Sequence, residues 1–418
     1  MKTRAIRNLV ATATMVCLLL PGVAALAETE MGWSKALYVR NKDKGYDIKF
    51  GGRIQNDWIW NNADDEMDAA ISGIENGIKF RRVRLYTSGT VFYNVFYKFQ
   101  LDFAGGDADF KDMFVGVKNL PLIYSVLVGH QYEPAGLETI TSSKYITFLE
   151  RAGVSTLMPE RHTGINAYRS WPNDKVTAAL GAFQNSDSYG DAFGDVWAFT
   201  GRLTFAPINE NKGEKLLHIG GSFSNREAQD GVFILKSRPE NPIVPSFLDT
   251  DTLFADKYNV FGGEAAFTWG PFSTQAEYAA SQVTNAMVED TSGTETLPNG
   301  EPGSSVGDPV FQAYYVQASY FITGEHRGYK HGKHSGIKVK KPYTGQEGGG
   351  GGAWEVAARY SVVDFNDGQV QGGEFNTVTV GVNWYLNDVF RIMADYAHVD
   401  AKDVGTMDNI GVRFSLFF

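Results

Sequence analysis

Cysteine is almost absent from this sequence of 418 residues, which has one, Cys17. A single cysteine excludes an intrachain disulfide, so the fold does not depend on the disulfide framework common in small exported proteins. Histidine is also scarce, with seven residues, and there is no GxSxG motif or distinctive pairing of a nucleophile with a base. After residue 27 no apolar stretch is long enough for a membrane-spanning helix.

The first 27 residues have the features of a secretory signal peptide. A basic start over residues 2–7 is followed by a mostly apolar stretch over residues 9–20, and the segment ends in Ala25-Leu26-Ala27. This ending predicts cleavage after Ala27, so we expect the mature chain to begin near Glu28. A lipid anchor on Cys17 is the alternative, although Val16 is larger than the residue such sites normally accept.

Cleavage would change both the cysteine content and the charge. It removes the only cysteine and three of the 38 Lys and Arg residues, leaving 35 against 48 Asp and Glu, a net charge of −13. Glycine is abundant (46 residues), aromatic residues make up 13%, and mean hydropathy is −0.24. An exported acidic chain of this composition fits an outer-membrane barrel, which is apolar outside and polar inside. From composition alone, a secreted β-rich enzyme fits equally well.

Alternation of apolar and polar residues favours the barrel. The odd positions from Val91 to Phe103 are all apolar or aromatic, and residues 376–386 show the same period of two. In the last ten residues, Ile410, Val412, Phe414, Leu416 and Phe418 alternate with mostly polar residues. Side chains on a strand point alternately to opposite faces, so these strands have one apolar face. A final strand that ends on Phe resembles the closing strand of bacterial outer-membrane barrels.

The same pattern recurs along the chain. We expect strands near residues 46–60, 78–88, 91–103, 110–118, 123–130, 161–170, 174–185, 197–206, 216–226, 257–269, 272–282, 311–322, 353–364, 375–386, 389–399 and 409–418. These sixteen segments predict an all-β fold, a closed antiparallel transmembrane β-barrel of 16 strands with a water-filled lumen. The predicted domains are the signal peptide (1–27), a periplasmic N-terminal segment (28–45) and the barrel (46–418).

Connections of alternating length support this topology. Short turns are expected at 88–90, 119–121, 171–173, 270–271 and 387–388, and long ones at 61–77, 131–160, 227–256 and 283–310. The third outer loop, 131–160, lacks strand signals, and in porins a long third loop commonly folds inward to narrow the pore. Segment 323–352 is long yet falls on the periplasmic side, and its glycines at 348–352 indicate a flexible tether.

Charged residues occupy the polar face of the predicted strands. The inward cations are Lys49, Arg53, Arg82, Arg84, Lys98, Arg202, Arg226, Arg359, Arg391 and Arg413; the inward acids are Asp57, Asp102, Asp112, Glu277, Glu355 and Asp395. This cationic excess favours anions, because Arg and Lys replace part of an anion's hydration shell. The alternative is that the cations pair with the lumen acids and only solvate the wall.

A second group of cations lies in segment 325–341. It comprises Arg327, Lys330, Lys333, Lys338, Lys340 and Lys341, against the single acid Glu325. At the periplasmic mouth this cluster would raise the local anion concentration; a solvated loop is the alternative. His326, His331 and His334 lie in the same segment, but no acidic or sulfur ligand completes a spaced site, so no metal is expected.

Several segments together resemble the phosphate-selective porin O and P family. They are FGGRIQ (50–55), KFRR (79–82), YKFQLDF (97–103), FKD (110–112), GLETITSSKYITFLER (136–151), FSTQAEY (272–278), ITGE (322–325), GAWEVAARY (352–360) and VGVNWY (380–385). They occur in order over nearly the whole mature chain, and the block at 136–151 is the most specific. The resemblance implies a trimer of 16-stranded barrels with the third loop inside and a central anion site.

The resemblance also implies site residues. Those that fall where the family places the constriction or its neighbours are Arg53, Arg81, Arg82, Lys98, Asp112, Ser142, Ser143 and Arg151. Phosphate-specific members have a lysine where this chain has Thr139, so we expect weaker capture of a divalent oxyanion unless Lys144 compensates. The family's outer arginine ladder is represented by a shorter version around Lys236 and Arg238.

The alternation of the strand and the family resemblance disagree about the position of Arg81. A strict period of two turns Arg82 and Arg84 inward and leaves Arg81 outward, where an Arg facing lipid at mid-depth costs about 2–4 kcal/mol. We expect a bulge that turns Arg81 inward, or a place at a subunit interface or near the strand end.

We therefore predict an outer-membrane porin for passive diffusion of small anions, with phosphate or related oxyanions preferred. Cations draw anions in, the third loop narrows the path, and Arg53, Arg82 and the Ser142/Ser143 hydroxyls replace lost hydration. Asp112 keeps binding weak enough for release, as conduction requires. No cofactor, catalytic residue or nucleic-acid partner is expected. The alternatives are a weakly selective general porin, a barrel enzyme such as a phospholipase, and a structural or adhesive barrel with a blocked lumen.

Overall fold

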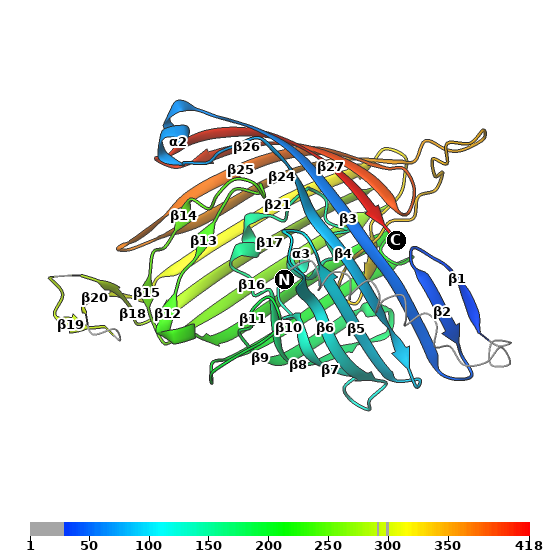
Figure 1. Cartoon of the computed structure of the whole chain (residues 1–418), viewed down its shortest axis with the longest axis horizontal. Helices are drawn as coiled ribbons and strands as arrows, with labels where there is room; N and C mark the ends of the chain where they lie inside the picture. Colours follow the sequence, from blue (N-terminus) through cyan, green and yellow to red (C-terminus); the bar gives the residue numbers. More distant parts are fainter. Residues whose placement is uncertain (1–28, 291, 298–300) are drawn as a thin grey trace, which may run out of the picture.

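The protein is a closed β-barrel in the computed structural model, which describes residues 29–290, 292–297 and 301–418 (Figure 1). The barrel closes where β27 (Gly405–Phe417) pairs antiparallel with β3 (Tyr46–Ala63), in a register from Arg53–Phe417 to Ala63–Met407. The predicted signal peptide lies outside the described residues and stays a prediction.

Sixteen strands form the wall, each antiparallel to its neighbours in chain order. Between β3 and β27 they are β4 (Gly77–Val91), β5 (Val95–Asp102), β6 (Asp109–Lys118), β7 (Ser125–Tyr132), β8 (Arg161–Ser170), β9 (Val176–Gln184), β10 (Trp197–Glu210), β11 (Lys215–Glu227), β16 (Lys257–Trp269), β17 (Phe272–Thr284), β21 (Val310–Phe321), β24 (Ala353–Asp367), β25 (Val370–Tyr385) and β26 (Phe390–Ala401). All sixteen predicted segments are confirmed as strands.

One predicted turn is wrong. Residues 88–90 do not form a turn; they belong to β4 and pair with residues 96–98 of β5. The turn comes at Phe92-Tyr93-Asn94, where Phe92 and Tyr93 adopt positive φ angles of 50° and 68°. The alternation that begins at Val91 runs on through these two bulky residues, so the sequence pattern does not show the turn.

The two faces of the wall differ as the alternation predicts. On β27, Ile410 and Phe414 are 52% and 39% exposed on the outside, whereas Arg413 and Ser415 are fully buried on the inside. Strands with apolar outer and polar inner residues suit a barrel in lipid. Within the described residues no helix is long and apolar enough to cross a membrane.

A hairpin precedes the barrel. Strands β1 (Glu30–Trp33) and β2 (Leu37–Asn41) pair with each other, and β2 also pairs with the first residues of β3. The hairpin therefore extends the sheet beyond the end of the barrel where the C-terminus lies (Figure 1).

Three connections fold into the barrel. The third loop (residues 133–160, between β7 and β8) carries α3 (Leu137–Ile140) and η2 (Gly153–Thr156). The fifth loop (residues 228–256) carries the short strands β12 (Val232–Phe233), β13 (Lys236–Ser237), β14 (Leu248–Asp249) and β15 (Leu253–Phe254). The periplasmic segment (residues 322–352) carries the hairpin of β22 (Gly328–Lys330) and β23 (Lys333–Ser335). We predicted only the first of these as an inward fold.

The remaining elements lie at the outer end. Helix α2 (Asp65–Ala70) packs on β3 and β27, and β18 (Ala286–Glu289), β19 (Glu295–Thr296) and β20 (Pro302–Gly307) complete a five-stranded sheet with β12 and β15. This sheet projects from the barrel at the left of Figure 1.

Apolar packing seats the loops on one side of the lumen. Val154, Leu157 and Met158 of the third loop are buried in one cluster with Phe233 and Leu248 of the fifth loop. The wall contributes inward apolar residues from the outer halves of β17, β21, β24 and β25, namely Val283, Phe311, Val363 and Phe375. Burial of such side chains stabilises each by roughly 1.5–3 kcal/mol. This packing leaves the open part of the lumen toward the opposite wall.

Candidate functional site

The tip of the third loop meets Arg53 of β3. The Arg53 guanidinium is buried, and its Nη1 donates hydrogen bonds to Ser143 Oγ at 2.6 Å and Ser142 Oγ at 3.4 Å. It forms no ion pair with a carboxylate in the described part of the chain. The geometry thus brings Arg53, Ser142 and Ser143 together, as the sequence predicts.

Other arginines hold the third loop by its backbone. Arg391 donates to the carbonyl oxygens of Ile146 (2.8 Å) and Thr147 (2.9 Å), and Arg359 donates to that of Glu150 (3.1 Å). Arg413 donates to the Leu149 carbonyl. A buried carbonyl without a partner costs about 1–3 kcal/mol, so these bonds fix a loop that has no ladder of its own.

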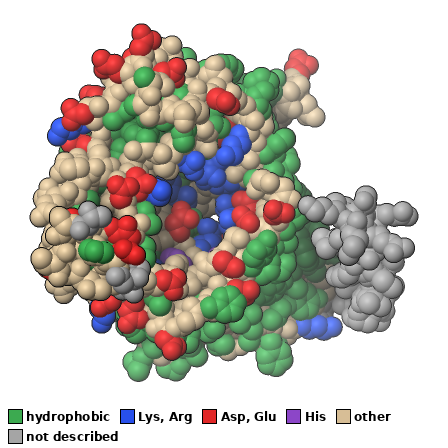
Figure 2. Space-filling model, turned by 60° about the vertical axis from the view of Figure 1, so that its left-hand side comes forward, with side chains coloured by type: hydrophobic (Ala, Val, Ile, Leu, Met, Phe, Trp, Pro, Cys, Tyr) green, Lys and Arg blue, Asp and Glu red, His purple; other side chains and the backbone are tan. Residues whose placement is uncertain are grey.

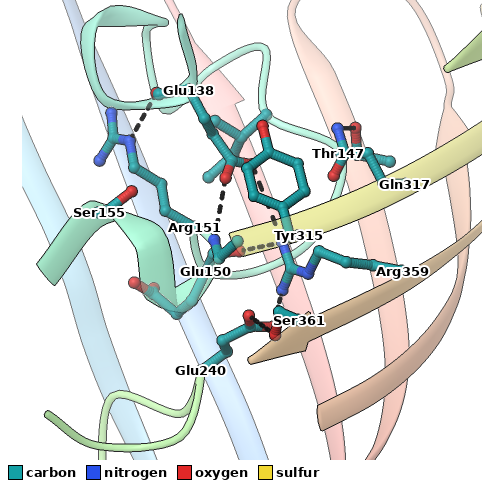
Figure 3. Close-up of polar contacts among 12 residues, drawn as sticks. Glu138, Thr147, Glu150, Arg151, Ser155, Glu240, Tyr315, Gln317, Arg359 and Ser361 are labelled. Atoms are coloured by element: carbon teal, nitrogen blue, oxygen red, sulfur yellow. Dashed lines mark hydrogen bonds and ion pairs between the residues drawn. The ribbon is translucent and has the colours of Figure 1, made fainter. Parts of the chain in front are cut away.

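Wall carboxylates satisfy the amide groups of the same loop. Glu277 accepts the first two amides of α3, from Leu137 (2.6 Å) and Glu138 (2.8 Å), while Asp395 accepts the Leu149 amide at 2.6 Å. The fifth loop adds Glu240, which accepts the Gly153 amide (3.1 Å). Figure 3 shows Glu240 beside Arg359 and Ser361, with the third loop above them.

Arg81 lies inside the barrel because of a β-bulge. Gln55 of β3 pairs with Arg82 and Asn56 pairs with Phe80, so Arg81 is the extra residue between them. Its guanidinium forms a bidentate ion pair with Glu150, at 2.8 and 2.9 Å. Of the three explanations expected for Arg81, the bulge is the one observed, and the conflict with the strict alternation disappears.

Glu150 is the shared carboxylate of this region. It also lies 2.9 Å from Arg413 and 3.9 Å from Arg82, whose Nη1 donates to Gln55 Oε1 at 3.1 Å. Burial acts to raise the pKa of Glu150, but the three guanidinium groups hold that pKa well below its usual value. Arg413 also pairs with Asp57 at 2.5 Å. Three cations and two carboxylates leave one net positive charge here.

Lys98 and Asp112 belong to a second group, with Arg161. Asp112 accepts from Lys98 Nζ and from Arg161 Nε (2.7 Å), and Arg161 stacks on the Tyr132 ring with 3.8 Å to its centroid. Two cations again share one carboxylate. Arg161 was not predicted as a site residue, although it is the first residue of its strand and directly follows the loop.

The remaining third-loop residues lie apart from Arg53. Arg151 donates to the carbonyl oxygens of Glu138 (2.9 Å) and Thr141 (2.7 Å). Thr139 is buried, and its hydroxyl lies 3.4 Å from Ser155 Oγ. Position 139 therefore adds no side chain to the open lumen.

A cavity of about 300 Å³ lies on the outer side of the third loop. Three of its lining residues are arginines, Arg81, Arg151 and Arg238, and three are glutamates. Figure 2 looks into the outer end and shows Lys and Arg side chains gathered around the hollow, with acidic side chains between them. Of the two predicted funnel residues, Arg238 lines this cavity; Lys236 is exposed and pairs with Asp249 at 2.6 Å.

A larger cavity of about 650 Å³ lies on the periplasmic side. Its charged lining residues are Lys98, Lys118, Arg202, Lys330 and Lys333 against one carboxylate, Glu133. Burial and the nearby Lys98 lower the pKa of Lys333 to about 8. Lys98 and Arg202 are paired with Asp112 and Glu264, whereas Lys118, Lys330 and Lys333 have no ion pair in the described chain.

The six cations of the predicted periplasmic cluster lie in three different environments. Arg327 is buried in the barrel, where it pairs with Glu355 and donates to the Tyr145 carbonyl of the third loop at 3.1 Å. Lys330 and Lys333 line the larger cavity, whereas Lys338, Lys340 and Lys341 are exposed.

The three histidines of this segment take part in separate contacts. His331 pairs with Asp174 at 3.2 Å, His326 contacts the Arg327 carbonyl at 3.0 Å, and His334 lies against the Tyr329 ring. Among the described residues no three His, Cys, Asp or Glu side chains are grouped to hold a metal ion.

Pairing with acids accounts for most of the lumen arginines. The wall pairs are Arg84–Asp102, Arg202–Glu264, Arg226–Glu133, Arg359–Glu240 and Arg413–Asp57. Two of these five acids, Glu133 and Glu240, lie on loops, where strand alternation gives no signal. Of the six acids predicted to point inward, Asp57, Asp102, Glu277, Glu355 and Asp395 are buried and Asp112 is partly buried.

Residues 48–415 match the model of one protein family, phosphate-selective porin O and P. The chain belongs to this family. It is 27% identical to Porin O of Pseudomonas aeruginosa over 427 aligned positions, which cover 90% of this chain and 87% of that protein.

Solved structures show the same fold. An anion-selective porin from Comamonas acidovorans superposes with a TM-score of 0.54 at 12% identity, covering 89% of this porin and all of that chain. The trimer form of OmpT from Vibrio cholerae gives 0.52 at 12% identity, covering 90% and 100%. Membership of the family places this porin in the bacterial outer membrane and identifies it as a channel-forming barrel.

Proposed function

We propose that this porin is a passive channel for small anions, with phosphate or related oxyanions preferred, and that it works as a homotrimer. The observation that carries the proposal is the charge of the periplasmic cavity. Of its five lining cations, Lys98 and Arg202 are paired with acids, but Lys118, Lys330 and Lys333 have no ion pair in the described chain. Such a lining raises the local concentration of anions and lowers that of cations.

The proposed path runs past Arg53. An anion that leaves the outer cavity meets a guanidinium already beside two hydroxyls, and these donors replace water molecules that it loses. Charge-assisted hydrogen bonds are roughly twice as strong as neutral ones. Arg53 has no ion pair in the described chain, so its guanidinium can make such a bond to the anion.

Carboxylates along the path keep anions from binding too tightly. Asp112 neutralises one of its two cations, and Glu150 opposes Arg81 and Arg82. Conduction needs sites that an anion both enters and leaves, and a partly neutralised lining meets that need.

Similarity to other porins supports the proposed anion preference and the proposed trimer. The Comamonas porin is described as anion-selective, and the Vibrio porin forms trimers. Phosphate preference rests on the family and on the pair of serines beside Arg53. Thr139, which is buried, favours the second candidate, a weakly selective general porin.

The proposal is tested by phosphate block of the chloride current in planar bilayers. The wild-type current should fall as inorganic phosphate is added, and Arg53→Gln should need several times more phosphate for the same block. Lys42→Gln, in the exposed turn between β2 and β3, is the matched control. An anion-selective channel without block would identify the general porin, and a cation-selective one would contradict the proposal.

A further inference from the structure

One side of the periplasmic cavity is apolar, although inward positions of the barrel form it. The apolar side chains come from four strands: Phe96 of β5, Phe114 of β6, Leu127 of β7 and Ala179 of β9. Farther from the periplasmic end, the inward positions next to Phe96 and Phe114 are polar, Lys98 and Asp112, which pair with each other. Inward residues of a channel barrel are normally polar. These four side chains therefore form an apolar patch inside the lumen.

The two phenyl rings of the apolar patch are held in place by the strands. The Phe96 and Phe114 rings meet edge to face, with their centroids 6.1 Å apart. Gly116 of β6 leaves room for the Phe96 ring, since a Cβ at this position would lie 2.6 Å from Phe96 Cζ. Edge-to-face packing is a favoured arrangement of aromatic pairs. The patch is thus a preformed surface, which lowers the entropic cost of binding another ring.

Cations line the same cavity. Three of them, Lys118, Lys330 and Lys333, have no ion pair in the described chain. The one carboxylate of the lining, Glu133, is already paired with Arg226 at 2.8 Å. Each ammonium group carries three N–H donors, so donors remain for an anionic ligand. The cavity volume of about 650 Å³ lies within the range of roughly 300–1,000 Å³ typical of pockets for organic molecules.

We propose that the periplasmic cavity binds small aromatic carboxylates, with the ring against Phe96 and Phe114 and the carboxylate at the lysines of the β22–β23 hairpin. The inference rests on the proposed function, because the ligand enters through an anion-conducting lumen, and it adds a class of organic ligand. A hydrated inorganic anion gains nothing from the apolar patch, and an uncharged aromatic molecule gains nothing from the lysines. Only a ligand with both a ring and a negative charge uses both features.

The test compares two carboxylates that differ by the ring. The chloride current through the full-length porin is measured in planar bilayers at pH 7, with added benzoate or acetate, both of which are ionised. Benzoate should reach half-block at about one tenth of the acetate concentration. This factor corresponds to about 1.4 kcal/mol, less than full burial of a Phe side chain contributes. Benzyl alcohol, which has the ring without the charge, controls for effects on the lipid and should not block.

Variants locate the site within the barrel. Phe96→Ala should raise the half-blocking benzoate concentration several-fold and leave that of acetate unchanged. Phe99→Ala is the matched control, because Phe99 lies on the same strand but is 45% exposed on the outer face. The double variant Lys330→Gln/Lys333→Gln removes charge from the hairpin and should also weaken the benzoate block.

The outcomes separate the inference from the proposed function. A wild-type channel that prefers cations contradicts both. An anion-selective wild type with equal half-blocking concentrations of benzoate and acetate overturns the aromatic carboxylate site alone, and so does wild-type benzoate block in Phe96→Ala. If Phe96→Ala forms no channels, the double lysine variant decides, since benzoate block equal to that of the wild type overturns the site.

Discussion

The arginines in this lumen differ in what their guanidinium groups bind. Arg413 is fully buried between Asp57, Glu150 and the Leu149 carbonyl, so its donors are used by the protein. Arg53 donates to the hydroxyls of Ser142 and Ser143 and has no ion pair in the described chain. Because both residues occupy inward positions of neighbouring strands, alternation predicts the same role for each. The difference comes from what approaches each residue: carboxylates of Asp57 and Glu150 reach Arg413, whereas Arg53 meets the hydroxyls of two loop serines.

Replacement of Arg82 tests the cationic path at the residue scale. Arg82→Ala removes a buried positive charge near Glu150. Glu150 itself remains paired with Arg81 and Arg413. We expect the anion-to-cation permeability ratio to fall about fivefold. A change of this size corresponds to a loss of about 1 kcal/mol of favourable electrostatic energy for the anion. Reversal potentials under a KCl gradient measure this ratio. An unchanged ratio would remove Arg82 from the mechanism.

Neutralising Glu150 should have the opposite effect on selectivity. Glu150→Gln leaves three guanidinium groups facing Asp57 alone, so anion preference should increase. The same change should lower stability by roughly 3–5 kcal/mol, because buried cations lose their partner. Reversal potential and thermal unfolding of the variant measure the two effects. Reduced anion preference would show that Glu150 acts through the loop position and not through its charge.

At the scale of elements, three inward segments shape the lumen. The third and fifth loops share an apolar cluster at the outer end, and the periplasmic segment reaches the third loop from the other side through Arg327 and the Tyr145 carbonyl. The hairpin of β22 and β23 is held by the wall, where Arg202 donates to the Gly332 carbonyl at 2.7 Å and His218 bonds the Tyr329 hydroxyl at 2.8 Å.

Removing the hairpin should widen the periplasmic half of the channel. Replacing residues 329–334 by a short Gly-Ser link keeps Arg327 and its partner Glu355 but removes Lys330 and Lys333 from the cavity. We expect higher single-channel conductance with weaker anion selectivity. Shortening the exposed stretch 344–351 is the control and should change neither. Conductance equal to that of the wild type would show that the hairpin does not limit the path.

The elements differ in how far the sequence predicts them. Each strand faces lipid on one side and water on the other, so its apolar and polar residues alternate with a period of two. The number and order of the strands therefore follow from the sequence pattern. The bulge at Arg81 is detectable only as a break in that pattern. The inward folds of the fifth loop and the periplasmic hairpin depend on contacts between distant residues, such as Glu240 with Arg359, and no local pattern encodes them.

The same limit applies to the site. Arg53, Ser142 and Ser143 are brought together as predicted, and they come from the segments that carry the family resemblance. Glu150 is within such a segment too, but its three guanidinium partners come from two strands at opposite ends of the chain. The division of the periplasmic cations into buried, cavity-lining and exposed residues follows from the hairpin fold, which composition cannot supply.

At the scale of the whole molecule, an acidic protein surrounds a cationic interior. The expected mature chain carries a net charge of −13, yet three cations without an ion pair in the described chain, Lys118, Lys330 and Lys333, line the periplasmic cavity. Acids such as Asp65, Glu66 and Asp68 of α2 lie on outer loops. Net charge therefore does not predict the ion preference of this porin; the positions of the charges do.

Assembly is a further property of the whole molecule. We expect three copies in each particle of purified porin. Light scattering in detergent, corrected for bound detergent, measures the protein mass directly. A particle containing one copy would contradict the proposed trimer without affecting the proposed path, since every residue of that path comes from a single chain.

The most direct test of the central claim is the zero-current potential of the wild-type porin in a planar bilayer under a KCl gradient at pH 6. If the unpaired cations govern permeation, the sign of that potential will show chloride to be several times more permeant than potassium. A potential near zero, or one of the opposite sign, would contradict the account of an anion path built on Arg53 and the periplasmic cavity.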